Sequence, residues 1–458
     1  MKKHIHLIGI GGSGMSSIAH VLLEQGYKVS GSDQSLSAMA LNLRESGAVV
    51  YQGHAAEHIL GASLVVRSSA ISDENPEVLA AQQAGIPVMK RMDFIHTLLD
   101  QRESIAVAGS HGKTTSSAML AWSLQQTGID AGYILGGTSL NLNSNAHSGS
   151  SPYFVIEADE YDNMFLGIEP KIVLLTNVEY DHPDCFPTVS SYHTAFSTFI
   201  QQIKPGGALV LNADDRGAAA KGENLPAGVR LLTFGLQHTP SFKAIDLRLN
   251  EAGGFSFTVE ASGSSEPVAM VRLQIPGEHN VLNSLGVLTV HAALGRPLQA
   301  AADALSTYLG AGRRFEIVAV ENGITIIDDY AHHPSKIRAT LAAARSRFPH
   351  QRIIAVWQPH TYSRTRSLEG DFLLSFTDAD LVIVTDVYTS REKKETYSPE
   401  SLIERIDKPA AKYIASLSSV VDYLSDELQP GDVVLVLSAG DANQICRDLA
   451  AILSERKG

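Results

Sequence analysis

Two glycine-rich loops have the residue spacing of phosphate-binding sites. The first, in "HLIGIGGSGMSS", places Gly9, Gly11 and Gly14 between an apolar run and a helical pattern. Glycines at this spacing let the backbone approach a pyrophosphate at a helix N-terminus. Asp33 ends the next apolar run, where an acid would meet a ribose hydroxyl. Taken alone, the loop favours NAD. A UDP-sugar also satisfies its chemistry, and a glycine turn without a ligand is the simplest alternative.

The second loop, "AGSHGKTT", predicts a triphosphate site. Its residues Gly109, Gly112, Lys113 and Thr114 follow an apolar run and open a helical pattern. Backbone N–H groups and the Lys113 ammonium would hold the β- and γ-phosphates of ATP, and the Thr114 hydroxyl would reach Mg²⁺. Val107 stands where the general motif has its first glycine, so the loop is a variant. A dehydrogenase has no need of a triphosphate site, which weakens the NAD interpretation.

Acidic residues and a histidine follow the next two apolar runs. "VIEADEYD" contains Glu157, Glu160 and Asp162, and "TNVEYDH" contains His182. Side chains at the carboxyl ends of parallel strands share one crevice, and beside a phosphate loop such groups suit Mg²⁺. For Glu160 and Asp162, a solvated position that caps a helix is the alternative.

Further polar groups lie toward the C-terminus. "PGEHNVLN" alone is typical of a helix start with polar side chains, and the arginines of "GRRFE" lie beside an aromatic residue. "DDYAHHP" and "QPHTYSRTR" directly follow apolar runs, which again places them on the crevice side. The two histidines of "DDYAHHP" could indicate zinc, but no third ligand stands at a suitable spacing.

The elements that must position these groups form three α/β units. Short apolar runs alternate with helical patterns from residue 4 to about 90, and again from about 104 and from about 311. Between about 228 and 276 the pattern becomes β-rich, which predicts an antiparallel insertion or edge. We therefore expect an α/β protein with domains at 1–103, 104–310 and 311–458. The first and third would be Rossmann-like, and the central one a phosphate-loop ATPase domain with a mixed sheet.

Composition narrows the function classes. The 458 residues carry a formal net charge of -13, which argues against a general nucleic-acid binder and against docking on an anionic membrane. The two cysteines indicate a reducing compartment without a disulfide framework. The N-terminal stretch is too short and too rich in glycine to be a secretory signal or a membrane span. We expect a cytoplasmic protein.

The ordered set of motifs resembles the Mur ligase family. The set spans nearly the whole chain: "GIGGSGM", "SSAI", "AGSHGKTT", "EADEYD", "TNVEYDH", "PGEHNVLN", "GRRFE", "DDYAHHP" and "QPHTYSRT". The resemblance implies a UDP-sugar site made by Gly11, Gly12, Ser13, Gly14, Ser68, Ser69, His360 and Arg364. It implies an ATP site made by Gly109, Ser110, His111, Gly112, Lys113, Thr114, Thr115, His279, Asn283, Arg314 and Asp329.

The resemblance also implies the chemistry and its remaining groups. Two Mg²⁺ ions would be held by Thr114, Glu157 and His182, and Tyr330 would lie near the amino acid. The catalytic set would be Lys113, Glu157, His182, Arg314 and Arg364. The implied reaction joins L-alanine to the carboxylate of UDP-N-acetylmuramate through an acyl phosphate, with ATP consumed, in peptidoglycan precursor synthesis. The protein would be a monomer or a weak homodimer.

Some residues depart from the alanine-adding members of the family. Tyr161 stands where these members usually have serine, and the usual late Gly-Ala-Gly-Asp motif begins here with Ser438. "EADEYD", with "EYDH" and Phe186 after it, is similar to the relative that attaches a recycled tripeptide to UDP-N-acetylmuramate. That ligase is the alternative within the family. Outside the family, the alternatives are an NAD-dependent dehydrogenase and a nucleotide-binding regulatory module.

Overall fold

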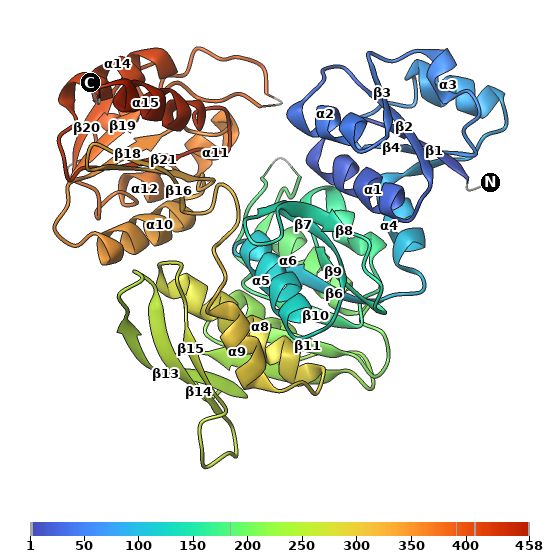
Figure 1. Ribbon diagram of the computed structural model, residues 1–458, viewed down its shortest axis with the longest axis horizontal. Coiled ribbons are helices and arrows are strands. Elements are labelled where there is room, and N and C mark those ends of the chain that lie inside the picture. Colours follow the sequence, from blue (N-terminus) through green and yellow to red (C-terminus); the bar gives the residue numbers. More distant parts are fainter. Residues whose placement is uncertain (1–2, 184, 391, 407–408, 457–458) are drawn as a thin grey trace.

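Three β-sheets, each flanked by helices, build the computed structural model, which describes residues 3–183, 185–390, 392–406 and 409–456. Figure 1 shows the C-terminal unit at upper left and the N-terminal unit at upper right, with the central unit below both. The expected α/β class with a mixed central sheet is confirmed. No helix among the described residues is long and apolar enough to cross a membrane.

The N-terminal sheet is parallel throughout, in the order β3-β2-β1-β4-β5. Its strands are β1 (His4–Ile8), β2 (Lys28–Asp33), β3 (Val49–Gln52), β4 (Leu64–Arg67) and β5 (Val88–Lys90). Its helices are α1 (Ser13–Glu24), α2 (Ala38–Glu45), α3 (Pro76–Gln83) and α4 (Arg91–Leu99), with a 3-10 turn η1 (Ala56–Ile59). The sequence pattern predicted β1, β2 and β4. The other two strands have four and three residues and, unlike β4, bury almost none of them, since only Val50 is buried.

A buried carboxylate connects α3 to β2 and η1 in the N-terminal unit. The side chain of Glu77, in the first turn of α3, is 0% exposed. Its carboxylate accepts a hydrogen bond from Ser32 Oγ at 2.5 Å and lies 2.8 Å from His58 Nδ1 and 3.2 Å from His54 Nδ1. Burial alone would raise the pKa of Glu77, but the hydrogen bonds from His6, Ser32 and His58 outweigh it and lower the pKa to about 2. The ionised carboxylate is therefore a stabilising group.

Replacing Glu77 with Gln should lower the free energy of unfolding by about 2 kcal/mol, because hydrogen bonds to a charged acceptor are lost in a buried place. A thermal melt at pH 7 measures this, with the exposed Glu74→Gln as the matched control. The contribution of Glu77 is present above its ordinary pKa of 4.5 and is lost as the pH falls toward 2. Equal melting temperatures for the two variants would contradict this role.

The central sheet has ten strands, in the order β15-β14-β13-β12-β11-β10-β6-β9-β7-β8. They are β6 (Glu103–Ala108), β7 (Gly132–Ser139), β8 (Ser144–His147), β9 (Tyr153–Glu157), β10 (Ile172–Leu175), β11 (Ala208–Asn212), β12 (Arg230–Gly235), β13 (Phe242–Leu249), β14 (Phe255–Ala261) and β15 (Ala269–Arg272). The α-helices are α5 (Lys113–Gln126), α6 (Val189–Ile200), α7 (Arg216–Ala219), α8 (Glu278–Ala293) and α9 (Leu298–Leu305). The predicted antiparallel edge is present in β13, β14 and β15, whereas β12 pairs parallel with both of its neighbours.

The C-terminal sheet has the order β16-β17-β21-β18-β19-β20, and only β16 runs antiparallel to its neighbour. Its strands are β16 (Glu316–Glu321), β17 (Ile324–Asp329), β18 (Ile353–Trp357), β19 (Leu381–Val384), β20 (Ala410–Tyr413) and β21 (Val433–Leu437). The α-helices are α10 (Pro334–Arg347), α11 (Tyr362–Ser367), α12 (Glu369–Leu373), α13 (Glu400–Ile403), α14 (Leu417–Glu427) and α15 (Gln444–Glu455). The four strands that the pattern predicted, β17, β18, β19 and β21, form the buried centre of the sheet.

Candidate active site

The loop between β6 and α5 has the backbone of a phosphate cradle. Gly109 has a φ of +136° and Gly112 a φ of +80°, in the region where side chains are strained. A Cβ on Gly109 would stand 2.1 Å from Thr176 Oγ1, and one on Gly112 would stand 2.6 Å from Asn283 Oδ1. Both glycines are therefore required by the fold of the loop. Lys113 then begins α5.

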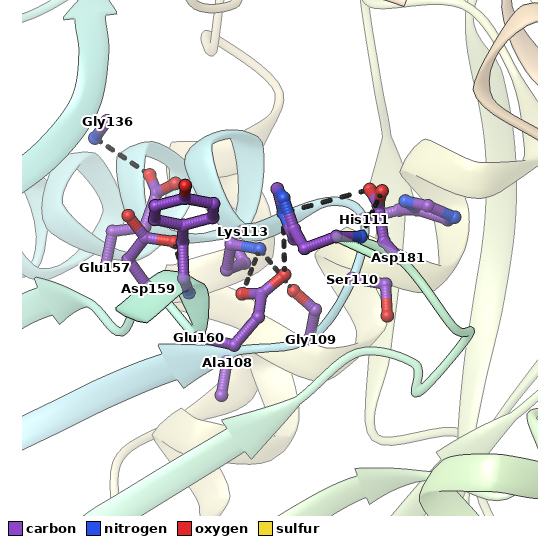
Figure 2. A network of polar contacts seen from close by, with 12 residues as sticks. Ala108, Gly109, Ser110, His111, Lys113, Gly136, Glu157, Asp159, Glu160 and Asp181 are labelled. Atoms are coloured by element: carbon purple, nitrogen blue, oxygen red, sulfur yellow. Dashed lines mark hydrogen bonds and ion pairs between the residues drawn. The ribbon is translucent and has the colours of Figure 1, made fainter. Parts of the chain in front are cut away.

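The Lys113 ammonium is held between the loop and a buried acid (Figure 2). Its Nζ donates to Glu160 Oε2 at 2.7 Å and to the Gly109 carbonyl at 2.5 Å. Burial would lower the pKa of Lys113, but the charges of Glu160, Asp159 and Glu157 outweigh it and raise the pKa. The ammonium is therefore charged and positioned before any phosphate arrives.

Glu160 is not the solvated acid that the sequence left open. Its side chain is 0% exposed and accepts a hydrogen bond from Tyr192 Oη at 3.3 Å. His182 Nε2 lies 3.7 Å from Glu160 Oε1. Asp162, by contrast, is exposed. The apolar run of β9 ends before Glu160, so the sequence does not show where this side chain points. Only the folded structure shows that its carboxylate contacts Lys113.

The predicted metal ligands fall into two groups. Thr114 Oγ1 donates to Glu157 Oε1 at 3.1 Å, and Glu157 Oε2 accepts from the Gly136 N–H at 2.8 Å. A hydroxyl and a carboxylate so close together are a donor set that fits Mg²⁺. His182 stands instead with Glu160 and with Asp181, whose Oδ2 is 3.9 Å from His182 Nε2.

A cavity of about 210 Å³ lies beside the phosphate cradle, between the central and C-terminal units. It is lined by seven of the residues predicted for ATP: His111, Gly112, Thr115, His279, Asn283, Arg314 and Asp329. Burial lowers the pKa of His279 to about 4, so this imidazole is neutral at physiological pH. Arg314 reaches the cradle from the domain junction, with Nη2 3.4 Å from Thr114 Oγ1.

Two predicted ATP residues have side chains engaged elsewhere. Ser110 Oγ contacts the Glu179 carbonyl at 2.6 Å and Tyr192 Oη at 2.8 Å, inside the core. The Asp329 carboxylate accepts from the backbone N–H groups of Phe315 and Ala331, at 2.7 and 2.8 Å. These two side chains shape the walls of the site.

Two arginines lie close to the ring of Tyr330. The guanidinium carbons of Arg313 and Arg314 lie 5.1 and 4.9 Å from the centre of its ring. Its backbone N–H also donates to the Arg313 carbonyl at 2.8 Å. Tyr330 therefore lies next to the nucleotide cavity with two guanidinium groups beside it. These cations could bind a carboxylate.

A buried ion pair joins the C-terminal unit to the central one. Arg364 Nη2 donates to Asp181 Oδ1 at 2.9 Å, and the two side chains are 6% and 2% exposed. Burial would raise the pKa of Asp181, but the charge of Arg364 outweighs it and holds that pKa well below its usual range. His360 Nδ1 lies 3.0 Å from Arg364 Nη1. His360 and Arg364 are thus adjacent, as expected, at the domain junction.

A second junction contact involves the histidines first weighed as zinc ligands. His333 has potential ligand atoms within 4.8 Å of those of His111 and Glu179. Glu179 accepts from Ser335 Oγ at 2.6 Å, and its other oxygen is 2.6 Å from His111 Nε2. This trio contains only one of the two histidines of "DDYAHHP". Its hydrogen bonds run from His111 to Glu179 within the central unit and from Ser335 to Glu179 between the two units.

The N-terminal glycine loop is held by the acid once considered a ribose ligand. Asp33 Oδ2 accepts from the Gly11 N–H at 2.9 Å, so Asp33 fixes the loop itself. Gly12, the residue before α1, provides no side-chain cap. The first N–H groups of the helix, including those of Ser13 and Gly14, therefore have no intrahelical partners. Among the two predicted serines, Ser68 lies 3.1 Å from a Cβ built on Gly9, and Ser69 is exposed.

Arg91 is a site residue that the sequence did not reveal. A Cβ on Gly14 would lie 2.2 Å from Arg91 Nη1, so the guanidinium rests directly against the glycine loop. Burial lowers the pKa of Arg91, opposed by the charge of Asp159, and its Nε has no hydrogen-bond partner among the described residues. A half-buried cation beside a helix N-terminus is suited to bind a diphosphate.

Three family models match consecutive parts of the chain. Residues 4–103 match "Mur ligase family, catalytic domain", residues 107–291 match "Mur ligase middle domain" and residues 313–440 match "Mur ligase, glutamate ligase domain". The expected family resemblance is thus supported over most of the chain.

Curated relatives and solved structures agree. A protein of Geobacter sulfurreducens named UDP-N-acetylmuramate--L-alanine ligase is 40% identical over 461 residues, covering 99% of this chain and 98% of the relative. A protein of the same name from Clostridium acetobutylicum is 39% identical over 449 residues, covering 97% of each.

The crystal structure of the UDP-N-acetylmuramate-alanine ligase of Thermotoga maritima superposes with a TM-score of 0.84 at 28% identity, covering 99% of this chain and 100% of that chain. The murein peptide ligase of Psychrobacter arcticus superposes with a TM-score of 0.72 at 27% identity, covering 99% of each. The chain belongs to the Mur ligase family.

Proposed function

We propose that this protein joins L-alanine to the carboxylate of UDP-N-acetylmuramate, with ATP converted to ADP and phosphate, in peptidoglycan precursor synthesis. The observation that carries this proposal is one cleft in which the Lys113 cradle and the Thr114–Glu157 pair meet Arg314. The curated relatives named for this activity cover nearly the whole chain. The murein peptide ligase is the structurally more distant of the two neighbours compared, which favours alanine over a recycled tripeptide.

The residues of the cleft fit a two-step amide synthesis. A carboxylate oxygen of the sugar attacks the γ-phosphorus, ADP leaves, and an acyl phosphate forms. The alanine amine then attacks the acyl carbon, loses a proton, and phosphate departs with the former carboxylate oxygen. Negative charge gathers on phosphoryl oxygens in the first step and on the acyl oxygen in the second. Lys113, Arg314 and Arg364 are the cations placed to stabilise it.

Mg²⁺ supplied with ATP would neutralise phosphate charge in this cleft. We propose Thr114 and Glu157 as ligands of one ion and His182 as a ligand of a second. For the nucleotide, His279 and Asn283 would contact the adenine. Tyr330, with Arg313 and Arg314 beside its ring, would lie next to the carboxylate of alanine.

The N-terminal loop would hold the diphosphate of the UDP-sugar. Gly11, Gly12, Ser13 and Gly14 would surround it, with the N–H groups of Ser13 and Gly14 and the hydroxyls of Ser68 and Ser69 as donors and Arg91 as its principal cation. His360 and Arg364 would reach the muramoyl end from the C-terminal unit. The sugar substrate would thus bridge two domains, and closure of the C-terminal unit would assemble the site.

Replacing Arg91 with Met should raise the KM for UDP-N-acetylmuramate by about tenfold, because a charge-assisted contact to the diphosphate is lost. The KM for ATP should stay within about twofold, since Arg91 begins α4 of the N-terminal unit and rests against the Gly14 loop. Steady-state kinetics with each substrate varied measure this. Lys90→Met, an exposed neighbour, is the matched control. A KM for the sugar equal to that of the control would remove Arg91 from the site.

The amino donor is tested by phosphate release with UDP-N-acetylmuramate and ATP, comparing L-Ala, Gly, L-Ser and the tripeptide. We expect the highest kcat/KM with L-Ala. Turnover that is faster with the tripeptide would establish the recycling ligase instead. NADH-dependent absorbance change without ADP would establish a dehydrogenase, and nucleotide binding without any ligation would establish a regulatory module.

We further propose domain limits at 1–103, 104–310 and 311–458, a monomer or weak homodimer, and a cytoplasmic location. Cys185 and Cys446 are not joined to each other by a disulfide, which fits a reducing compartment. The net charge of -13 does not favour nucleic acid or an anionic membrane as a partner.

A further inference from the structure

Lys336 is a cation of the nucleotide cavity that the proposed function has not used. It lies in the first turn of α10, at the end of the helix where unpaired N–H groups add partial positive charge. Lys336 lines the cavity together with the cradle residues His111, Gly112 and Thr115. No side-chain hydrogen bond joins its Nζ to another described residue. It therefore faces the cavity as an unused donor.

Positive charge is concentrated around Lys336. Burial, then the cations Lys113, Arg314 and Arg364, lower its pKa to about 8, opposed by Asp181. Asp181 is already paired with Arg364 at 2.9 Å, so it is not a dedicated partner.

The other titratable groups nearby are hydrogen-bonded elsewhere or neutral. Glu179 is hydrogen-bonded to His111 and to Ser335. His111, His332 and His333 all have lowered pKa values, chiefly through burial, and are neutral at physiological pH. Lys113 and Arg364 each have an ion-pair partner, Glu160 and Asp181. No ion pair among the described residues involves Lys336, and a phosphate group would give it one.

We infer that Lys336 binds the terminal phosphate of the nucleotide from the C-terminal side of the cleft, opposite Lys113. This inference rests on the proposed ATP-dependent ligase function. Because Lys336 belongs to the C-terminal unit and Lys113 to the central one, the terminal phosphate would join the two units. ADP, which lacks that phosphate, would lose this contact. Lys336 therefore makes the closed form depend on the triphosphate.

Direct binding measurements test this separately from ligation. Calorimetry with the full chain and Mg²⁺ would compare a non-hydrolysable ATP analogue with ADP. Lys336→Met should weaken the analogue by about tenfold and ADP by less than about threefold. Lys336→Arg should keep the analogue within about threefold of wild type, because the charge is retained. Lys28→Met, an exposed lysine of β2, is the matched control, and thermal melts check that all variants fold.

The pH dependence provides a readout that a structural role would not change. Wild-type affinity for the analogue should fall as the pH rises through about 8, because free Lys336 loses its proton. The Lys336→Arg variant should lack this decline, since arginine stays charged. Lys113 has a raised pKa and keeps its charge over this range.

The outcomes separate the inference from the proposed function. If wild type binds neither nucleotide, the ATP-dependent function itself fails. If wild type binds both and Lys336→Met changes neither affinity, Lys336 does not contact the nucleotide. If the two affinities fall by the same factor, the contact is not to the terminal phosphate. Either of the last two results overturns the inference and leaves the proposed function intact.

Discussion

Replacing Lys113 with Ala is expected to lower the rate of ADP and phosphate release by about a hundredfold to a thousandfold. The Lys113 ammonium is fixed by Gly109 and Glu160 at the start of α5, where the γ-phosphate would lie. A preorganised cation stabilises charge as it develops on the phosphoryl oxygens and does not need to reorient. A coupled ADP assay measures the rate. Binding of the UDP-sugar, measured by calorimetry, should survive because its loop is in the N-terminal unit.

The same substitution would also affect stability, which must be separated from catalysis. Glu160 is 0% exposed, and the loss of Lys113 leaves its carboxylate buried without its ammonium partner, at a cost of about 3 kcal/mol. The double variant Lys113→Met with Glu160→Gln removes both charges and should recover most of the melting temperature. It should remain as slow as Lys113→Ala. Rapid turnover by either folded variant would exclude Lys113 from phosphoryl transfer.

Replacing Arg364 with Ala is expected to reduce turnover by about a hundredfold, through loss of both a substrate contact and a domain contact. Arg364 is 6% exposed and pairs with Asp181, which is 2% exposed, across the junction of two units. Removal of the guanidinium leaves Asp181 as an unpaired buried charge, so the closed arrangement becomes less stable. Because Arg364 is also placed to stabilise the acyl phosphate, kcat should fall together with the affinity for the sugar. Steady-state kinetics with UDP-N-acetylmuramate varied measure both.

Arg366 offers a matched control two residues further along α11. It is exposed and paired with Glu395 near the surface, so Arg366→Ala should change the kinetics by less than about threefold. The Asp181→Asn variant separates the two roles of Arg364, because it disrupts the junction and keeps the guanidinium. It should raise the KM values for ATP and for the sugar together. Kinetics of Arg364→Ala that match those of Arg366→Ala would remove Arg364 from the site.

The sequence predicted best what is local. The two glycine loops combine a buried strand, a backbone-limited turn and a helix start within about a dozen residues, and each part leaves its own mark on the pattern. The central strands of the sheets were also found, because they are continuously apolar. Edge strands such as β16 and β20 were missed, because none of their residues is buried and burial imposes no pattern on their sequence.

Long-range partnerships could not be predicted. Arg364 and Asp181 are 183 positions apart, and nothing near either residue specifies the other. Arg91 follows an ordinary basic residue and becomes a site residue only because α4 begins beside the Gly14 loop. Asp33 stands where a ribose ligand would, yet its carboxylate is used by the Gly11 N–H. Residue type and spacing indicate the chemistry that a side chain can perform. The tertiary fold determines which neighbouring group it contacts.

The acyl phosphate is the central claim, and an isotope experiment tests it most directly. UDP-N-acetylmuramate with heavy oxygen in its carboxylate would be incubated with ATP, L-alanine and enzyme, and the released phosphate analysed by mass spectrometry. The mechanism predicts one heavy oxygen in each phosphate released, in step with amide formation, and ADP as the nucleotide product. Phosphate without heavy oxygen, or release of AMP and pyrophosphate, would contradict the mechanism.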